Sequence, residues 1–193
     1  MNSPTPSHQA VIAATRRWLE RAVIGLNLCP FAKGVHVKEQ IRYVVSDAAD
    51  EENLLADLER ELHMLLAAPP AEVDTTLLIH PAVLTAFEDF AAFLDVVNVV
   101  LRTQGLEGIL QVASFHPDYA FAGTDPDDIT NCTNRSPFPT LHLLREDSLD
   151  RAVAAFPDAA AIYERNLRTL RELGRDGWQA LGVGAPLPTV RSK

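Results

Sequence analysis

The sequence has little cysteine, no long apolar run and no charged leader before an apolar segment. Only Cys29 and Cys132 are present, too few for a disulfide framework or a four-cysteine metal site. The longest apolar candidate, residues 87–101, is interrupted by acidic and amide side chains, so it does not predict a membrane span. The polar, proline-rich residues 1–7 do not resemble a signal peptide. These absences predict a cytoplasmic protein in a reducing compartment, with no membrane partner.

Positive charge is also scarce, with 17 lysine and arginine residues against 26 aspartate and glutamate residues. The net charge of −9 disfavours nucleic acid as a partner, because binding to phosphates needs a basic face. The sequence contains no glycine-rich phosphate loop, no Gly-x-Ser-x-Gly motif and no His-Glu-x-x-His motif. By contrast, 47% of the 193 residues are hydrophobic, which is enough for one domain with a sizeable core. The expected partner is a small-molecule or peptide substrate.

Apolar periodicity predicts helices and strands that alternate along the chain. Helices are expected at residues 7–27, 50–68, 87–101, 149–156 and 158–173. Strands are expected at residues 35–45 (one strand or a hairpin), 75–79, 109–115 and 140–144. This order predicts an α/β fold with a mainly parallel four- to five-stranded sheet, an antiparallel last strand and helices that cover the sheet.

A single domain is expected at residues 8–182, between a disordered N-terminus (1–7) and a flexible tail (183–193). Four prolines in and just after the stretch 117–138 interrupt every candidate helix there. No crossover helix is therefore expected before the last strand. Without one, the strand at 140–144 is predicted to return antiparallel, at or near its predecessor.

Two histidines directly follow predicted strands: His80 comes after the second strand and His116 after the third. A right-handed crossover would make these two strands parallel. Both histidines are then expected at the same edge of the sheet, where ligands gather in α/β folds. Together with Asp118 they are predicted to hold one Fe or Zn ion that keeps open positions for a substrate. His142, on the last predicted strand, is a reserve ligand.

The loop 117–138 concentrates polar side chains after His116. Long loops inside compact domains are more often functional than not. Asp125 or Asp128 is predicted to act as a base or metal ligand, and Arg135 to hold an anionic group of the substrate. The sequence thus predicts one cleft that contains both histidines, a loop aspartate and Arg135. The ordinary alternative is a surface loop held by Asx turns.

The predicted function is an enzyme that acts on a small molecule or peptide by metal-assisted hydrolysis or oxidation, in a polar pocket at the carboxyl ends of the strands. A metal-free acid–base enzyme is the first alternative, in which His80 or His116 moves protons and Arg135 clamps the substrate. Cys29 is then a candidate nucleophile, although a free cysteine after a helix end is more typical of packing. The second alternative is a non-catalytic binding domain that uses the loop 117–138.

Four segments are specific enough to carry a family resemblance: NLCPFA at 27–32, SFHPDY at 114–119, TNRSPFP at 133–139 and LHLLRE at 141–146. Through them the chain resembles an uncharacterised bacterial family, domain of unknown function 1415, over most of its length. The resemblance implies a bacterial, single-domain, cytoplasmic protein. It brings no reaction, cofactor or catalytic residue, but it draws attention to Cys29, which belongs to the first motif.

Overall fold

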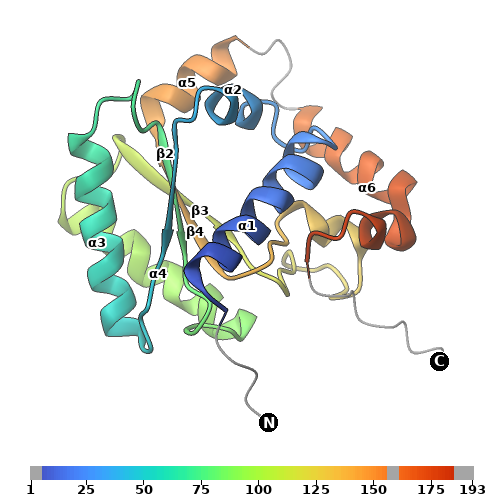
Figure 1. The fold of residues 1–193 in the computed structure, drawn as a ribbon, viewed down its shortest axis with the longest axis horizontal. Helices are drawn as coiled ribbons and strands as arrows, with labels where there is room; N and C mark the ends of the chain where they lie inside the picture. Colours follow the sequence, from blue (N-terminus) through green and yellow to red (C-terminus); the bar gives the residue numbers. More distant parts are fainter. Residues whose placement is uncertain (1–5, 156–160, 185–193) are drawn as a thin grey trace.

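The computed structural model describes residues 6–155 and 161–184, which form a four-stranded sheet with helices on both faces (Figure 1). The strands are β1 (Ile41–Val45), β2 (Thr75–Ile79), β3 (Leu110–Phe115) and β4 (Thr140–Arg145). Their order across the sheet is β1-β2-β4-β3. The α/β class is confirmed, and so is the existence of each of the four predicted strands.

The directions of the strands correct one part of the prediction. β1 and β2 are parallel, whereas β4 runs antiparallel to both of its neighbours, β2 and β3. Thr140 pairs with Phe115, so the antiparallel return of the last strand beside its predecessor is confirmed. The expectation of a mainly parallel sheet is wrong, because β4 inserts between β2 and β3 and prevents those two strands from pairing directly.

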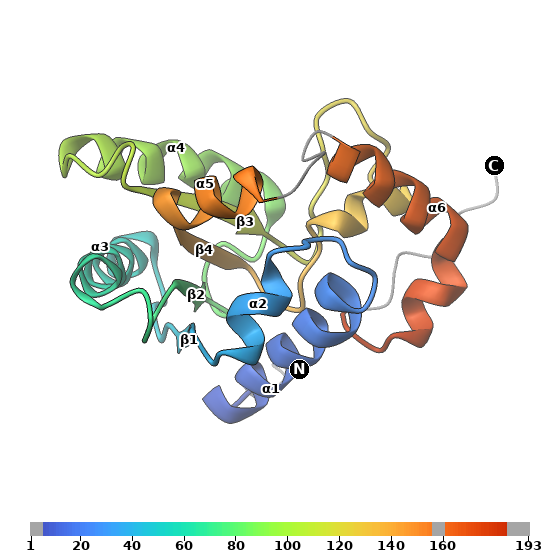
Figure 2. The same ribbon diagram turned by 90° about the horizontal axis from the view of Figure 1, so that it is seen from above.

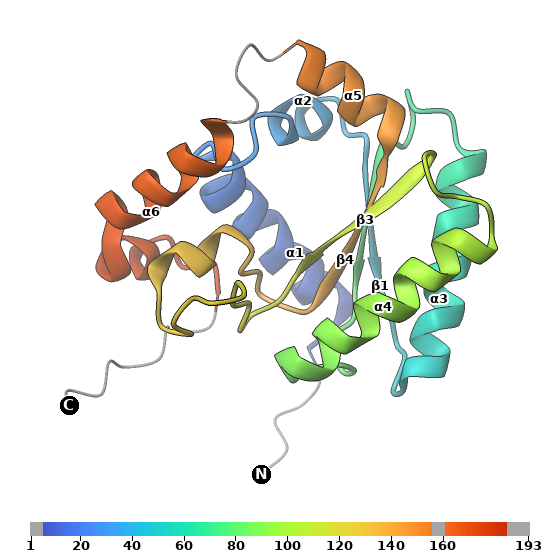
Figure 3. The ribbon, with the colours of Figure 1, turned by 180° about the vertical axis from the view of Figure 1, so that it is seen from behind.

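The helices α3 (Glu51–Ala67) and α4 (Phe87–Thr103) cover one face of the sheet, which we call the α3–α4 face (Figure 3). Asp50 begins α3 by accepting a hydrogen bond from the backbone N–H of Asn53 at 2.8 Å. The apolar stripe of α3 meets side chains of α4, β2 and β4 in one continuous core. Its largest members have no exposed surface: Leu54, Leu58, Leu62, Leu65, Leu78, Phe90, Leu141 and Leu143.

The opposite face, which we call the α1–α2 face, is covered by α1 (His8–Trp18) and α2 (Ala32–Val37) (Figure 2). Helix α1 begins at the predicted cap, Ser7, and continues into a π-helical turn at Leu19–Ile24. The strand or hairpin expected at 35–45 is wrong for its first half, which is helical. Val35 is half-buried and Val37 is 70% exposed, so the short apolar alternation of this segment reflects no buried strand face.

The C-terminal helices α5 (Glu146–Ala154) and α6 (Ala161–Ala180) follow β4. Helix α6 is kinked at Gly174, which adopts a φ of 66°. The loop 117–138 is less irregular than expected, because it contains a 3-10 helix, η2 (Ile129–Thr133), against which α6 packs. Residues 1–5 and 185–193, to which most of the predicted disordered N-terminus and flexible tail belong, lie outside the described residues.

Candidate functional site

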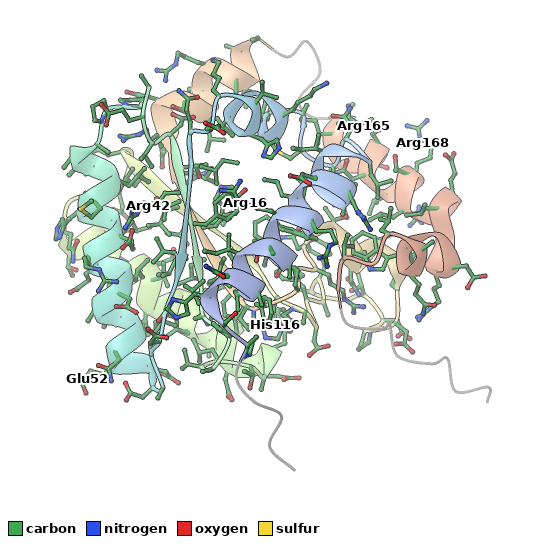
Figure 4. The ribbon with its side chains drawn as sticks, viewed as in Figure 1. Arg16, Arg42, Glu52, His116, Arg165 and Arg168 are labelled. Atoms are coloured by element: carbon green, nitrogen blue, oxygen red, sulfur yellow. The ribbon has the colours of Figure 1, made fainter. Side chains whose placement is uncertain are left out.

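His80 and His116 lie close together, as the predicted topology requires. They follow the carboxyl ends of β2 and β3, and the ring of Phe90 on α4 contacts both of them. The ring centroids are 5.6 Å apart for His80 and Phe90 and 5.2 Å apart for Phe90 and His116. Neither histidine has exposed surface. Figure 4 labels His116 near α4 at the lower end of the sheet.

Both ring nitrogens of His116 are occupied by backbone groups. Nε2 lies 3.2 Å from the carbonyl oxygen of Leu84, and Nδ1 accepts the backbone N–H of Asp118 at 3.0 Å. Nε2 therefore carries the ring proton, and the lone pair of Nδ1 already has a partner. Burial lowers the pKa of His116, so its ring is neutral at pH 7. Asp118 contributes its backbone N–H, not its carboxylate, to this contact.

His80 is sealed in a similar way. Its Nδ1 donates to the carbonyl oxygen of Val83 at 2.9 Å, and burial lowers its pKa to about 4. Its Nε2 is buried without a hydrogen-bond partner among the described residues. In residues 6–155 and 161–184, no group of three or more His, Cys, Asp or Glu side chains is arranged to hold a metal ion. The described residues therefore contain no group of three such ligands for the predicted Fe or Zn ion.

The three charged residues of the loop 117–138 that were predicted to act in the site, Asp125, Asp128 and Arg135, bond to groups of the loop itself. Arg135, 7% exposed, donates to the carbonyl oxygens of Tyr119 at 3.1 Å and Pro126 at 2.6 Å. Asp125 and Asp128 form Asx turns by accepting backbone N–H groups two residues further on, at 2.8 and 2.9 Å. These contacts match the ordinary alternative, because a loop without ladder partners must satisfy its backbone groups locally. Among the described residues, Arg135 forms no salt bridge with a carboxylate of the loop.

A cavity with mostly apolar walls lies on the other side of the sheet, on the α1–α2 face. It has a volume of about 540 Å³, within the range typical of small-molecule sites. It lies at the amino ends of β1 and β2 and the carboxyl end of β4, whereas the sequence predicted a pocket at the carboxyl ends of the other strands. We call it the sheet-face pocket. Its apolar lining residues include Trp18, Val23, Phe31, Leu77, Phe115 and Leu149.

His142 lies on the floor of the sheet-face pocket, in the central strand β4. The hydroxyl of Thr75 lies 2.7 Å from Nε2 of His142 and donates to the carbonyl oxygen of Leu143 at 2.6 Å. Because a hydroxyl has one hydrogen, it must accept from Nε2, which places the ring proton there. Nδ1 therefore bears a free lone pair. Nδ1 of His142 has no hydrogen-bond partner in the described part of the chain. Unlike Nε2 of His80, it is not among the fully buried unpartnered atoms.

The environment of His142 keeps it uncharged. Burial lowers its pKa to about 4, so the imidazole is neutral at pH 7. The floor of the pocket thus presents a hydrogen-bond acceptor and not a cation. The sequence predicts His142 only as a reserve metal ligand. In the structure it is the histidine that lines the sheet-face pocket.

Cys29 lies on the wall of the same pocket, where it is half-buried. Burial raises the pKa of its thiol, although hydrogen bonds from the backbone N–H groups of Phe31 and Ala32 oppose the shift. A protonated thiol is a poor nucleophile, so the packing interpretation of Cys29 is better supported than the nucleophile. Cys132 is fully buried, and burial raises its pKa to about 11.

Polar residues form one end of the pocket, between α2 and α5. The hydroxyl of Ser148 donates to Oδ1 of Asp74 at 2.6 Å, and Arg151 donates to the same hydroxyl at 3.0 Å. Gln40 donates to two backbone carbonyls of the loop before β2, at 3.2 and 3.0 Å. No local pattern in the sequence brings these residues near His142, because their meeting requires β4 to lie beside β2.

The model of one protein family, described as a protein of unknown function (DUF1415), matches residues 10–180. This range includes every strand and every residue that lines the sheet-face pocket. A search of curated proteins and a search of solved structures each found no match. Among the described helices, none combines the length and the apolar character needed to cross a membrane.

Proposed function

The chain belongs to the DUF1415 family, and we propose that it binds a small, mostly apolar organic molecule in the sheet-face pocket. The observation that carries the proposal is the free lone pair of His142 on the floor of a cavity whose walls are mostly apolar. Apolar walls supply affinity through burial, and a single polar group on the floor fixes the orientation of the ligand. The ligand is expected to present one hydrogen-bond donor, such as a hydroxyl or N–H, to Nδ1.

Binding is better supported than acid–base catalysis. In an enzyme that uses this pocket, His142 would accept the proton, in place of the sealed His80 or His116. A base with a pKa of about 4 is weak at neutral pH, because efficient general bases titrate near the working pH. It remains a good hydrogen-bond acceptor at that pH.

The metal-assisted hydrolysis or oxidation predicted from His80, His116 and Asp118 has less support. Neither nitrogen of His116 offers a free lone pair, and the carboxylate of Asp118 takes no part in the contact with the ring. Elemental analysis of the untagged protein tests the prediction directly. One Fe or Zn per chain, lost in His116→Ala, would restore the metal enzyme as the better proposal.

We further infer a bacterial cytoplasmic protein with no nucleic-acid or membrane partner. Both cysteines are free thiols, which is typical of proteins in a reducing compartment. The net charge of −9 supports the absence of a nucleic-acid partner. A small molecule fits a cavity of about 540 Å³ better than a peptide does, since a peptide needs an extended groove.

The test uses N-phenyl-1-naphthylamine, a neutral apolar probe that fluoresces in apolar surroundings and carries one N–H donor. We expect saturable one-to-one binding to the native protein. The variant Ala113→Phe places a ring in the pocket beside His142 and should reduce the affinity at least about tenfold. Ala92→Phe, at an exposed position of α4, is the matched control and should bind as the wild type does.

The thermal unfolding of each variant shows whether it is folded. If Ala113→Phe does not fold, Ala152→Phe blocks the same pocket from α5. Non-saturable fluorescence, or equal affinity in the blocked and control variants, would contradict the proposed site.

A further inference from the structure

The lining of the sheet-face pocket reverses the charge balance of the whole protein. The chain has 17 basic and 26 acidic residues. The pocket, however, is lined by three cationic side chains, Lys38, Arg145 and Arg151, and by one carboxylate, Asp74. A local excess of positive charge in an acidic protein favours an anionic ligand.

Two of these charged groups are already engaged. The guanidinium of Arg145 donates to the carbonyl oxygens of Leu65, Ala68 and Val73 and thereby holds the C-terminal end of α3. Asp74 accepts the hydroxyl of Ser148. A fourth cation on this face, Arg16, points from α1 toward β1, where its guanidinium lies 4.3 Å from the centre of the Tyr43 ring (Figure 4).

Lys38 and Arg151 keep donors for a ligand. Both are exposed, and neither forms a salt bridge with a described carboxylate. Arg151 donates one hydrogen bond, from Nη2 to the hydroxyl of Ser148, which leaves the other N–H groups of its guanidinium available. Lys38 is the C-cap of α2 and Arg151 lies on α5, and these two helices lie side by side at one end of the sheet (Figures 1 and 3).

We propose that the ligand is an organic acid, with its apolar body in the sheet-face pocket and its anionic head group between Lys38 and Arg151. This proposal rests on the proposed function. Carboxylate, sulfonate and phosphate groups all accept the charge-assisted hydrogen bonds that lysine and arginine donate. The neutral ring of His142 on the floor does not attract the anion. The anionic end of the ligand is therefore expected at Lys38 and Arg151, and its apolar end on the floor.

The experiment compares 8-anilinonaphthalene-1-sulfonate with N-phenyl-1-naphthylamine, which has the same ring system without the sulfonate. The double variant Lys38→Gln/Arg151→Gln should weaken binding of the sulfonate about tenfold, the scale of one to two exposed charge-assisted hydrogen bonds, and leave the neutral probe unchanged. The variant Lys38→Arg/Arg151→Lys should retain tight binding of the sulfonate.

A matched control separates a local contact from the loss of overall charge. Lys33→Gln/Arg102→Gln removes the same charge at exposed positions that do not line the pocket, and should bind both probes as the wild type does. If this control weakens sulfonate binding as much as Lys38→Gln/Arg151→Gln does, long-range attraction is the cause and the proposed head-group site is wrong. Unchanged sulfonate binding in Lys38→Gln/Arg151→Gln also overturns the head-group site. In that case, binding of the neutral probe still shows that the pocket is intact. Loss of specific binding for both probes in the wild type instead contradicts the proposed function.

Discussion

The histidines on the two faces of the sheet differ in how closely their surroundings are packed. On the α3–α4 face, two long helices fill the surface with leucine, and His80 and His116 are sealed with their ring N–H groups on backbone carbonyls. On the α1–α2 face, the six-residue helix α2 and the nine-residue helix α5 leave a cavity, and His142 lines it. The histidine with the proposed role in binding is thus distinguished by the packing around it and not by its position at the end of a strand.

The largest test of this contrast compares leucines from the two faces. Leu58→Ala on α3 should lower the free energy of unfolding by about 2–5 kcal/mol, because it opens a cavity in a filled core. Leu144→Ala on β4 should cost about 1 kcal/mol or less, because that side chain already borders the pocket. Urea unfolding of both variants gives the two values. Equal losses would show that the pocket side is packed as tightly as the other.

The pH dependence of stability sharpens the contrast further. Burial lowers the pKa of both His80 and His142 from 6.5 to about 4, so the unfolded chain binds more protons between these values. Stability is therefore full above pH 6.5 and falls as the pH drops toward 4, by up to about 3 kcal/mol for each histidine. His80→Gln should flatten this fall more than His142→Gln, because His80 has no exposed surface whereas His142 is partly exposed to the pocket.

Urea unfolding at several pH values between 7 and 4.5 measures both slopes. The control is His63→Gln, which changes an exposed histidine on α3. An unchanged slope in His80→Gln would mean that the buried ring does not resist protonation.

A smaller effect than that of Leu58→Ala is expected at the two cysteines. Cys29→Ala should cost about 1–2 kcal/mol of stability and leave binding of N-phenyl-1-naphthylamine intact. At pH 7, iodoacetamide should modify Cys29 slowly, because burial raises its pKa, and should leave the buried Cys132 unmodified. A saturating concentration of the neutral probe should slow the modification of Cys29 further, as mass spectrometry can follow. Rapid, selective alkylation of Cys29 would instead indicate an activated nucleophile.

The sequence predicts those parts of the fold that local patterns decide. The leucine stripe of α3 and the buried run of β2 are periodic over their whole length, so they are found where expected. The turn pattern of the loop 117–138 likewise predicts the antiparallel return of β4. Helix α2 was missed because the alternation of Val35, His36 and Val37 suits a strand as well as one helical turn.

The candidate site was harder to predict because it depends on contacts between distant segments. The parallel directions of β2 and β3 were enough to bring His80 and His116 together. Their nitrogens, however, bond to the carbonyls of Val83 and Leu84, and Leu84 adopts a left-handed conformation with a φ of 54° that no local pattern indicates. The partner of His142, Thr75, comes beside it only because β4 inserts next to β2.

The central position of β4 also constrains how the chain folds. During synthesis, β1, β2 and β3 emerge before β4, and β3 has no strand to pair with until residues 140–145 follow. The parallel pair of β1 and β2 is then left with an unpaired edge on the side that β4 will occupy. Closing the sheet means pairing Thr75 with Leu144 across a long separation in sequence, which makes this step slow compared with helix formation. The strand that completes the sheet is also the one that carries His142, so the pocket floor and the finished sheet form in the same event.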